Sequence, residues 1–215
     1  MGFRYNPSIV LDGLVLYLDA ANPKSYPGTG TTWYDLSGNG AHAIAESLPT
    51  FISNGPQSYF DFNGTSNEFA SVDISQEYRD IFVLMNLSST APGLSMVFGK
   101  YDDQDDSLRF DSGSLRGSGT TDSNDWQYLQ ESKVFRNGVF TSASLDMRNQ
   151  WSFLRAYRAN ITGFGTSFRY EISSSFISDT RHYKGGLSAI FCYNRELTND
   201  EVQQNFNALR GRFGL

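Results

Sequence analysis

Hydrophobic residues gather in short runs along this chain, and most of the runs have the length and alternation of β-strands. The longest apolar run covers 81–87, and we expect it to be a central strand. Turn-forming Gly, Asn and Ser residues separate the runs. The strands that this pattern predicts are 14–18, 59–62, 81–87, 96–101, 108–110, 134–136, 139–145, 151–157, 168–172 and 187–193.

The one clear helix is expected near the C-terminus. The segment 198–201, Thr-Asn-Asp-Glu, has the spacing of a capping box, in which Thr198 and Glu201 satisfy each other's backbone amides. Val202, Phe206 and Leu209 then recur on one helical face, and Gly211 supplies a helix stop. A strand buried on both faces followed by a capped helix characterises a fold and carries no catalytic chemistry.

Many short strands and a single terminal helix predict an all-β fold, a two-sheet antiparallel jelly-roll sandwich with one short C-terminal helix. The length of 215 residues suits one large all-β domain at least as well as two small ones. We therefore expect residues 13–215 to form a single sandwich domain, preceded by an N-terminal arm at 1–12.

Charge and composition narrow the range of partners. A formal net charge of −6 without any basic run argues against nucleic acid and against anionic membranes. No apolar run approaches the ~20 residues that a membrane helix needs, and the N-terminus lacks the apolar region of a secretory signal. The single cysteine, Cys192, lies in an apolar strand and is expected to behave as a small hydrophobe.

Several segments together resemble a known superfamily. The unit 184–202 is similar to the closing strand and helix of laminin-G-like domains, a branch of the concanavalin A-like lectin/glucanase superfamily. The segment 59–64, Tyr-Phe-Asp-Phe-Asn-Gly, resembles an early strand and turn of that branch. The loop 37–42, Ser-Gly-Asn-Gly-Ala-His, and the strand 168–172 match it as well. The resemblance implies the sandwich fold but no single activity, because this fold hosts lectins, adhesion modules and hydrolases.

A second resemblance concerns the start of the chain. The block 12–26, continued by Trp-Tyr-Asp-Leu-Ser-Gly at 33–38, is similar to a block in structural proteins of marine tailed bacteriophages, cyanophages in particular. This resemblance implies a virion component such as a capsid decoration, a fibre or a tail part, assembled in the host cytoplasm. Its partners would be other virion proteins and further copies of the same chain, with surface glycans as ligands.

The sequence does not show the motifs of a hydrolase, so we expect a non-enzymatic protein. Glucanases of this superfamily carry paired carboxylates on one strand, and retaining hydrolysis needs two carboxylates ~5 Å apart. The seven Glu residues here are far apart in sequence. His42 is expected to make a structural hydrogen bond in its loop, and His182 to be exposed. A carbohydrate-binding lectin-like module is the main alternative to a virion protein, and a glycoside hydrolase is the less favoured one.

One dense acidic cluster could bind a cation. Calcium is held by carboxylate and carbonyl oxygens, so the cluster is a candidate calcium site, although it lacks the central Gly and terminal Glu of an EF-hand loop. The competing interpretation is a solvated loop whose charges repel one another, which is the commoner role of a charge run. The four residues are Asp102, Asp103, Asp105 and Asp106.

Aromatic residues near loops offer platforms for sugar rings. Trp126 is the best candidate, because Asp122, Asn124 and Asp125 lie close by and could accept hydrogen bonds from sugar hydroxyls. Trp151, Phe153, Arg155 and Tyr157 share one face of a strand, and most of the aromatic residues are expected to cover the ends of the core instead.

Overall fold

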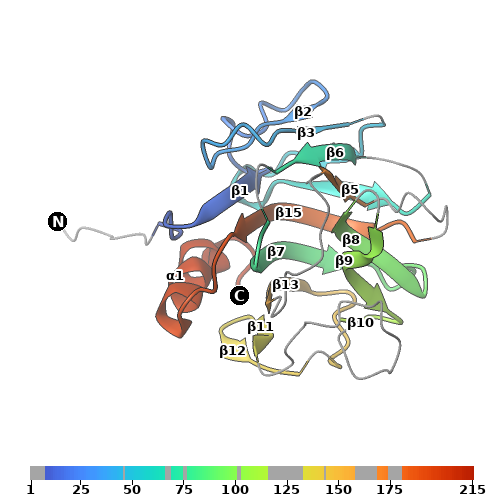
Figure 1. The fold of residues 1–215 in the computed structure, drawn as a ribbon. Helices are drawn as coiled ribbons and strands as arrows, with labels where there is room; N and C mark the ends of the chain where they lie inside the picture. Colours follow the sequence, from blue (N-terminus) through green and yellow to red (C-terminus); the bar gives the residue numbers. More distant parts are fainter. Residues whose placement is uncertain are drawn as a thin grey trace.

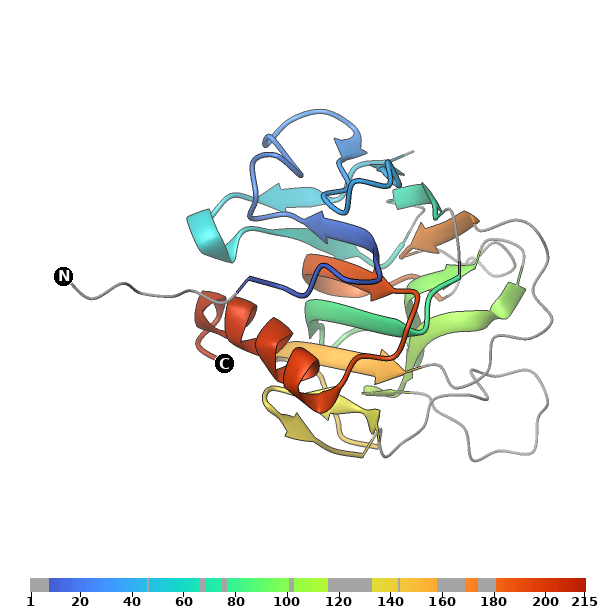
Figure 2. The same ribbon diagram turned by 60° about the vertical axis from the view of Figure 1, so that its left-hand side comes forward.

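The computed structural model of the protein places two antiparallel sheets face to face, with one helix on an outer face (Figures 1 and 2). This confirms the predicted two-sheet sandwich with a short C-terminal helix. The residues that the structure describes are 8–45, 47–65, 69–74, 77–100, 103–115, 133–142, 144–157, 169–173 and 181–215.

The larger sheet, called sheet A, contains the long strand formed by the C-terminal apolar run. Among the described residues it has eight strands. Seven follow the order β12-β11-β13-β7-β15-β5-β4, and the eighth, β1, pairs with the C-terminal half of β15. The bounds are β12 Val139–Phe140, β11 Phe135–Arg136, β13 Trp151–Tyr157, β7 Asp80–Leu87, β15 Lys184–Tyr193, β5 Tyr59–Asn63, β4 Thr50–Ile52 and β1 Leu14–Asp19.

The second sheet, called sheet B, faces sheet A across the core. Within the described part of the chain it has seven strands, in the order β10-β9-β8-β14-β6-β3-β2. The bounds are β10 Ser114–Leu115, β9 Asp103–Asp111, β8 Leu94–Lys100, β14 Arg169–Ile172, β6 Phe69–Asp73, β3 Ala43–Ile44 and β2 Thr32–Trp33.

Strand alternation sorts the side chains of sheet A into two hydrophobic clusters. On β13, Leu154 and Ala156 enter the core between the two sheets, while Phe153 points to the outer face. On β15, Ile190 enters the core between the sheets and Phe191 the outer cluster. Sheet A is therefore buried on both sides over much of its length, and this explains why its strands read as nearly continuous apolar runs.

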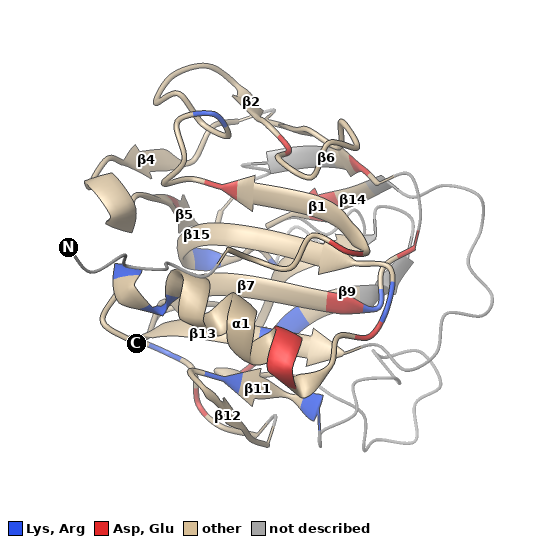
Figure 3. Ribbon diagram, turned by 90° about the vertical axis from the view of Figure 1, so that its left-hand side faces the viewer, with Lys and Arg blue, Asp and Glu red and all other residues tan. Residues whose placement is uncertain are grey.

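The outer cluster exists because the helix α1 (Asn199–Leu209) lies over the outer face of sheet A (Figure 3). Val202, Phe206 and Leu209 are buried there, as the helical periodicity predicts. The capping box is present, since Thr198 and Glu201 each accept a hydrogen bond from the other's backbone amide. No helix in the described part of the chain is long and apolar enough to cross a membrane.

The segment that precedes β1 is tied to this helix. The amide of Val10 donates to Oδ1 of Asn205 at 2.8 Å, and the Tyr193 hydroxyl donates to the carbonyl oxygen of Val10 at 2.8 Å. The Asn205 side-chain amide donates back to the Tyr193 hydroxyl. Asn205 is fully buried, so this closed network satisfies polar groups that would otherwise be costly to bury.

Several elements differ from the sequence-based expectation. The strands β2, β3, β4, β6 and β10 were not predicted, and the expected strand at 139–145 is only the two-residue β12. Gly211 does not stop the helix, because it lies within a 3-10 turn, η3 (Arg210–Arg212), that continues α1. After the helix, the glycine with a positive φ is Gly214, at +70°. Beside it, the amide of Leu215 donates to the carbonyl oxygen of Arg210 and closes the turn.

A buried ion pair joins the helix entry to the two neighbouring strands β7 and β13. Arg155 donates to both carboxylate oxygens of Asp80, at 2.7 and 3.0 Å, and both residues are at most 1% exposed. Each partner makes one further hydrogen bond, because Asp80 accepts from the amide of Leu197 and Arg155 donates to the carbonyl of Lys133. Such a pair is sensitive to the loss of either partner, since the survivor stays buried and uncompensated.

Removing the guanidinium should therefore destabilise the protein strongly. We expect Arg155→Met to lower the free energy of unfolding by about 3–5 kcal/mol, measured by urea denaturation. The control is Arg148→Ala, which breaks an exposed pair with Asp146 and should shift the midpoint far less. Equal shifts for the two variants would contradict the role of the buried pair.

The helix cap should make stability depend on pH. The guanidinium of Arg195, hydrogen-bonded to the Glu201 carboxylate, lowers the pKa of Glu201 from 4.5 to about 2. A depressed folded-state pKa stabilises the fold above pH 4.5, and this contribution is lost as the pH falls toward about 2.

We expect this contribution to be about 1 kcal/mol, because Glu201 is partly exposed and screened. Denaturation of Glu201→Gln should give lower stability at neutral pH and a correspondingly weaker loss on acidification. A variant that loses as much stability as the wild type over that range would refute the assignment.

Candidate functional site

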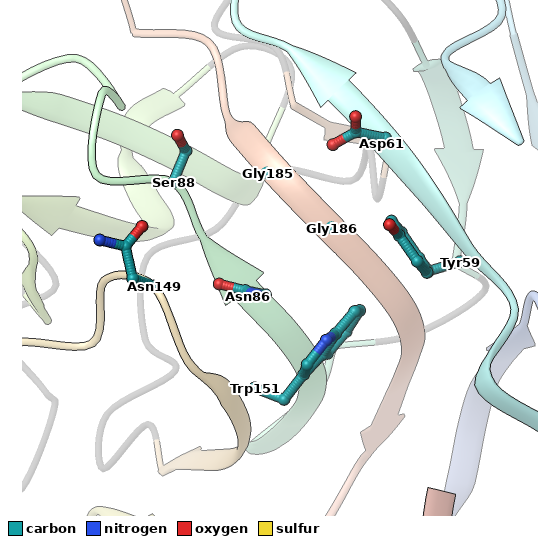
Figure 4. Close-up of a pocket in the computed structure, with 8 residues that line it drawn as sticks. All are labelled: Tyr59, Asp61, Asn86, Ser88, Asn149, Trp151, Gly185 and Gly186. Carbon is teal, nitrogen blue, oxygen red and sulfur yellow. The ribbon is translucent and has the colours of Figure 1, made fainter. Parts of the chain in front are cut away.

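A pocket of about 230 Å³ opens on the outer face of sheet A (Figure 4). This is the face that α1 covers. Asn86 lies two residues from Leu84 on β7, and Trp151 lies two residues from Phe153 on β13, so each pair shares one face of the sheet. Leu84 and Phe153 both belong to the outer cluster. The volume is smaller than the ~300–1,000 Å³ of pockets for drug-sized ligands, so it suits a ligand smaller than those. The residues that line it are Tyr59, Asp61, Asn86, Ser88, Asn149, Trp151, Gly185 and Gly186.

The strand register brings four of these residues into one row across the sheet. Trp151 pairs with Asn86, Asn86 with Gly186, and Gly186 with Asp61. Neighbouring strands lie ~4.8 Å apart, so Asp61 and Asn86 face each other across Gly186 with ~10 Å between their backbones. The pocket is thus a transverse feature that no single strand contains.

The floor of the pocket consists of two glycines of β15. Gly185 has a φ of +138°, and a Cβ there would overlap the carbonyl oxygen of Asn86. At Gly186 a Cβ would lie 3.0 Å from ring atoms of both Trp151 and Tyr59, so any side chain there would push against the two rings. Side chains at these positions would fill or distort the pocket, so the glycines keep it open.

One wall of the pocket is aromatic. The rings of Tyr59 and Trp151 meet edge to face with their centroids 5.1 Å apart. Phe213 stacks on the indole of Trp151 at 3.6 Å and 18°, and so covers one of its faces. Tyr59 and Trp151 are both half-buried, which leaves the rest of the wall accessible from the pocket.

The segment that carries Phe213 is clamped to β1. Arg212 donates to both carboxylate oxygens of Asp19 at 2.7 Å, and the Tyr17 hydroxyl donates to the same carboxylate at 2.8 Å. Burial, together with the charge of Asp19, raises the pKa of Tyr17 well above its usual value, so the hydroxyl remains a donor. The clamp fixes the position from which Phe213 reaches Trp151.

Three polar side chains of the pocket are available to a ligand. Within the described residues, the carboxylate of Asp61, the side-chain amide of Asn86 and the Nε1–H of Trp151 make no hydrogen bond. Asn149 is different, because its Oδ1 accepts from the amide of Ser89 and its φ is +57°. The site therefore offers both donors and acceptors beside an aromatic surface, an arrangement that can bind a polyhydroxylated ligand.

The predicted site residues do not form this pocket. Asp102 and the residues of the predicted sugar platform, Trp126, Asp122, Asn124 and Asp125, lie outside the described residues. Asp103, Asp105 and Asp106 belong to strand β9 and not to a loop, which corrects that part of the competing interpretation. Among the described residues, no group of three or more His, Cys, Asp or Glu side chains is arranged to hold a metal ion.

The two histidines have structural surroundings. Nδ1 of His42 accepts a hydrogen bond from the amide of Asp35 at 3.0 Å, which confirms its predicted role in the loop. His182, predicted to be exposed, is only 2% exposed. It is buried because its backbone forms a bridge with Met96 of β8, and its ring Nδ1 lies 3.1 Å from the carbonyl oxygen of Ser173. Burial also raises the pKa of the Cys192 thiol, in keeping with a role in packing.

The pocket residues were missed because their pattern resembles that of an ordinary strand. Trp151 was expected to help cover the core. It does so only in part, through the face of its indole that stacks on Phe213. One signal was present, the pair Gly185-Gly186 inside an otherwise apolar strand, since glycine in a strand interior often marks the close approach of a ligand or another backbone.

Comparisons with known proteins show the fold. No protein-family model matches the chain, and no curated protein is similar enough to count as a relative. The structure is similar to that of a Trypanosoma rangeli sialidase in complex with the inhibitor DANA, with 15% identity, a TM-score of 0.55, and coverage of 93% of this chain and 33% of the sialidase chain. A second structure of Trypanosoma rangeli sialidase gives 14% identity, a TM-score of 0.51 and the same coverage.

This similarity corrects one expectation. Both of these structures are of sialidases, which are enzymes, so the expectation of a non-enzymatic protein is corrected: the fold is one that enzymes contain. The chain spans about a third of the length of these sialidases, and at this level of identity the similarity shows a β-sandwich and no more.

Proposed function

We propose that the protein is a carbohydrate-binding module and that the pocket over Gly185 and Gly186 is its binding site. The observation that carries the proposal is the combination of an aromatic wall, a glycine floor, and polar groups of Asp61 and Asn86 that have no partner within the described residues. Sugars present an apolar ring face and several hydroxyls, and such a site complements both. The similarity to part of a sialidase is in keeping with a module that holds glycans.

A second part of the proposal concerns where the module acts. The blocks 12–26 and 33–38 and the closing unit 184–202 support a laminin-G-like domain of the kind found in virion proteins of tailed bacteriophages. We propose that it is carried on the surface of such a particle, together with other virion proteins and further copies of itself, after assembly in the host cytoplasm. The pocket would then hold glycans at the particle surface.

Binding should depend on the amide of Asn86. We expect the wild-type protein to bind a subset of glycans on an array, and Asn86→Ala to weaken the best of these about tenfold, which corresponds to one lost hydrogen bond. The affinities can be measured by titration calorimetry with the glycan that the array identifies.

The matched control is Asn207→Ala, which removes the same amide from a half-buried position on α1, away from the pocket residues. This variant should bind like the wild type. A protein that binds no glycan, or an equal loss in the two variants, would contradict the assignment of the pocket.

The particle proposal needs a different measurement. Mass spectrometry of purified phage particles from a host that produces this chain should detect it at a fixed copy number. Its absence from intact particles, with the chain found only in the lysate, would refute the virion role and leave the carbohydrate proposal standing.

A further inference from the structure

Asp61 is the one acidic or basic side chain among the pocket residues. It is exposed on β5, opposite Gly186, and its carboxylate makes no hydrogen bond within the described residues. The other polar residues that line the pocket are neutral. A ligand in the pocket therefore meets a negative charge that has no ion-pair partner within the described residues, in a protein whose net charge is already −6.

The two arginines closest to the pocket along the chain are engaged elsewhere. Arg148, next to Asn149, is bound to Asp146 through three hydrogen bonds of 2.7–3.1 Å. Arg212, next to Phe213, is held by Asp19. Lys184 precedes the two floor glycines, but its methylene groups lie over Gly64 in the turn after β5, and it does not line the pocket.

Among the described residues that line the pocket, a sugar acid would consequently find no positive partner. Recognition of a carboxylate depends on Arg or Lys, most effectively in a two-pronged arrangement with Arg. Here the carboxylate of the ligand would instead face that of Asp61, and like charges at contact disfavour binding. An amino sugar would gain from the same charge, and a neutral sugar could donate its hydroxyls to Asp61.

We infer that the pocket selects neutral and amino sugars and rejects sugars that carry a carboxylate, sialic acids among them. This inference rests on the proposed carbohydrate function and names the chemical class of its ligand. It makes Asp61 a specificity-determining residue, because the charge and not the shape of the pocket separates the sugars. The similarity to sialidases thus extends to the fold without extending to an acidic ligand.

A series of three hexoses tests the inference, since they differ mainly in charge: glucose is neutral, glucosamine is cationic and glucuronate is anionic. Titrations followed by NMR at low salt should rank the wild-type affinities as glucosamine, glucose, glucuronate. Adjacent members should differ about two- to fivefold, the range that an exposed charge pair supports. At ~1 M NaCl the Debye length is ~3 Å, so the differences should shrink.

Asp61→Asn keeps the size and the acceptor of the side chain but removes its charge. In this variant glucosamine should weaken and glucuronate should tighten, each about two- to fivefold, while glucose changes little. The matched control is Asp73→Asn, which removes an exposed carboxylate from β6 in sheet B and should leave the ranking unchanged.

The possible outcomes distinguish the charge selection by Asp61 from the proposed carbohydrate binding itself. Wild-type protein that binds glucuronate as tightly as glucose, or a ranking that survives Asp61→Asn, would overturn the charge selection while carbohydrate binding stands. Failure to bind any of the three sugars would overturn the pocket as a carbohydrate site, and the selection with it.

Discussion

The buried ion pair between Asp80 and Arg155 fixes the part of the sandwich on which the site depends. It joins the start of β7 to the end of β13 and also holds the amide of Leu197, just before the helix cap. Because the two strands are antiparallel and in continuous register, fixing one end sets the other, where Asn86 pairs with Trp151. A slip of either strand by one residue would turn the pocket side chain of that strand toward the core. The pocket thus inherits its geometry from a contact at the opposite end of the same two strands.

The outer face of sheet A is divided between packing and binding. Phe153 and Phe191 lie beneath α1, and their neighbours in the pocket stay accessible. Trp151 stands at the boundary, with Phe213 stacked on the indole and Tyr59 against its edge. Its position is therefore set from both sides before any ligand arrives, which reduces the entropy that binding must spend on ordering the ring.

Local patterns were sufficient for the long elements and insufficient for the site. The strand β13 and the capping box at Thr198 could be predicted because alternation and spacing over a few residues determine them. Two-residue strands such as β2 and β3 exist only through their partners, so no local pattern marks them. The pocket is even harder to predict from local patterns. Its row of residues comes from β13, β7, β15 and β5, and only the strand register aligns them. The predicted calcium and Trp126 sites rested on local clustering, which says nothing of what the sheet brings together.

The position of Phe213 has a practical consequence for anyone who handles this protein. The chain turns back directly after it, because the amide of Leu215 donates to the carbonyl of Arg210. A purification tag, a fluorophore or a neighbouring domain joined after Leu215 would therefore emerge beside the aromatic wall. A group attached there is well placed to obstruct the pocket or to report on its occupancy, so assays of binding should compare protein with and without it.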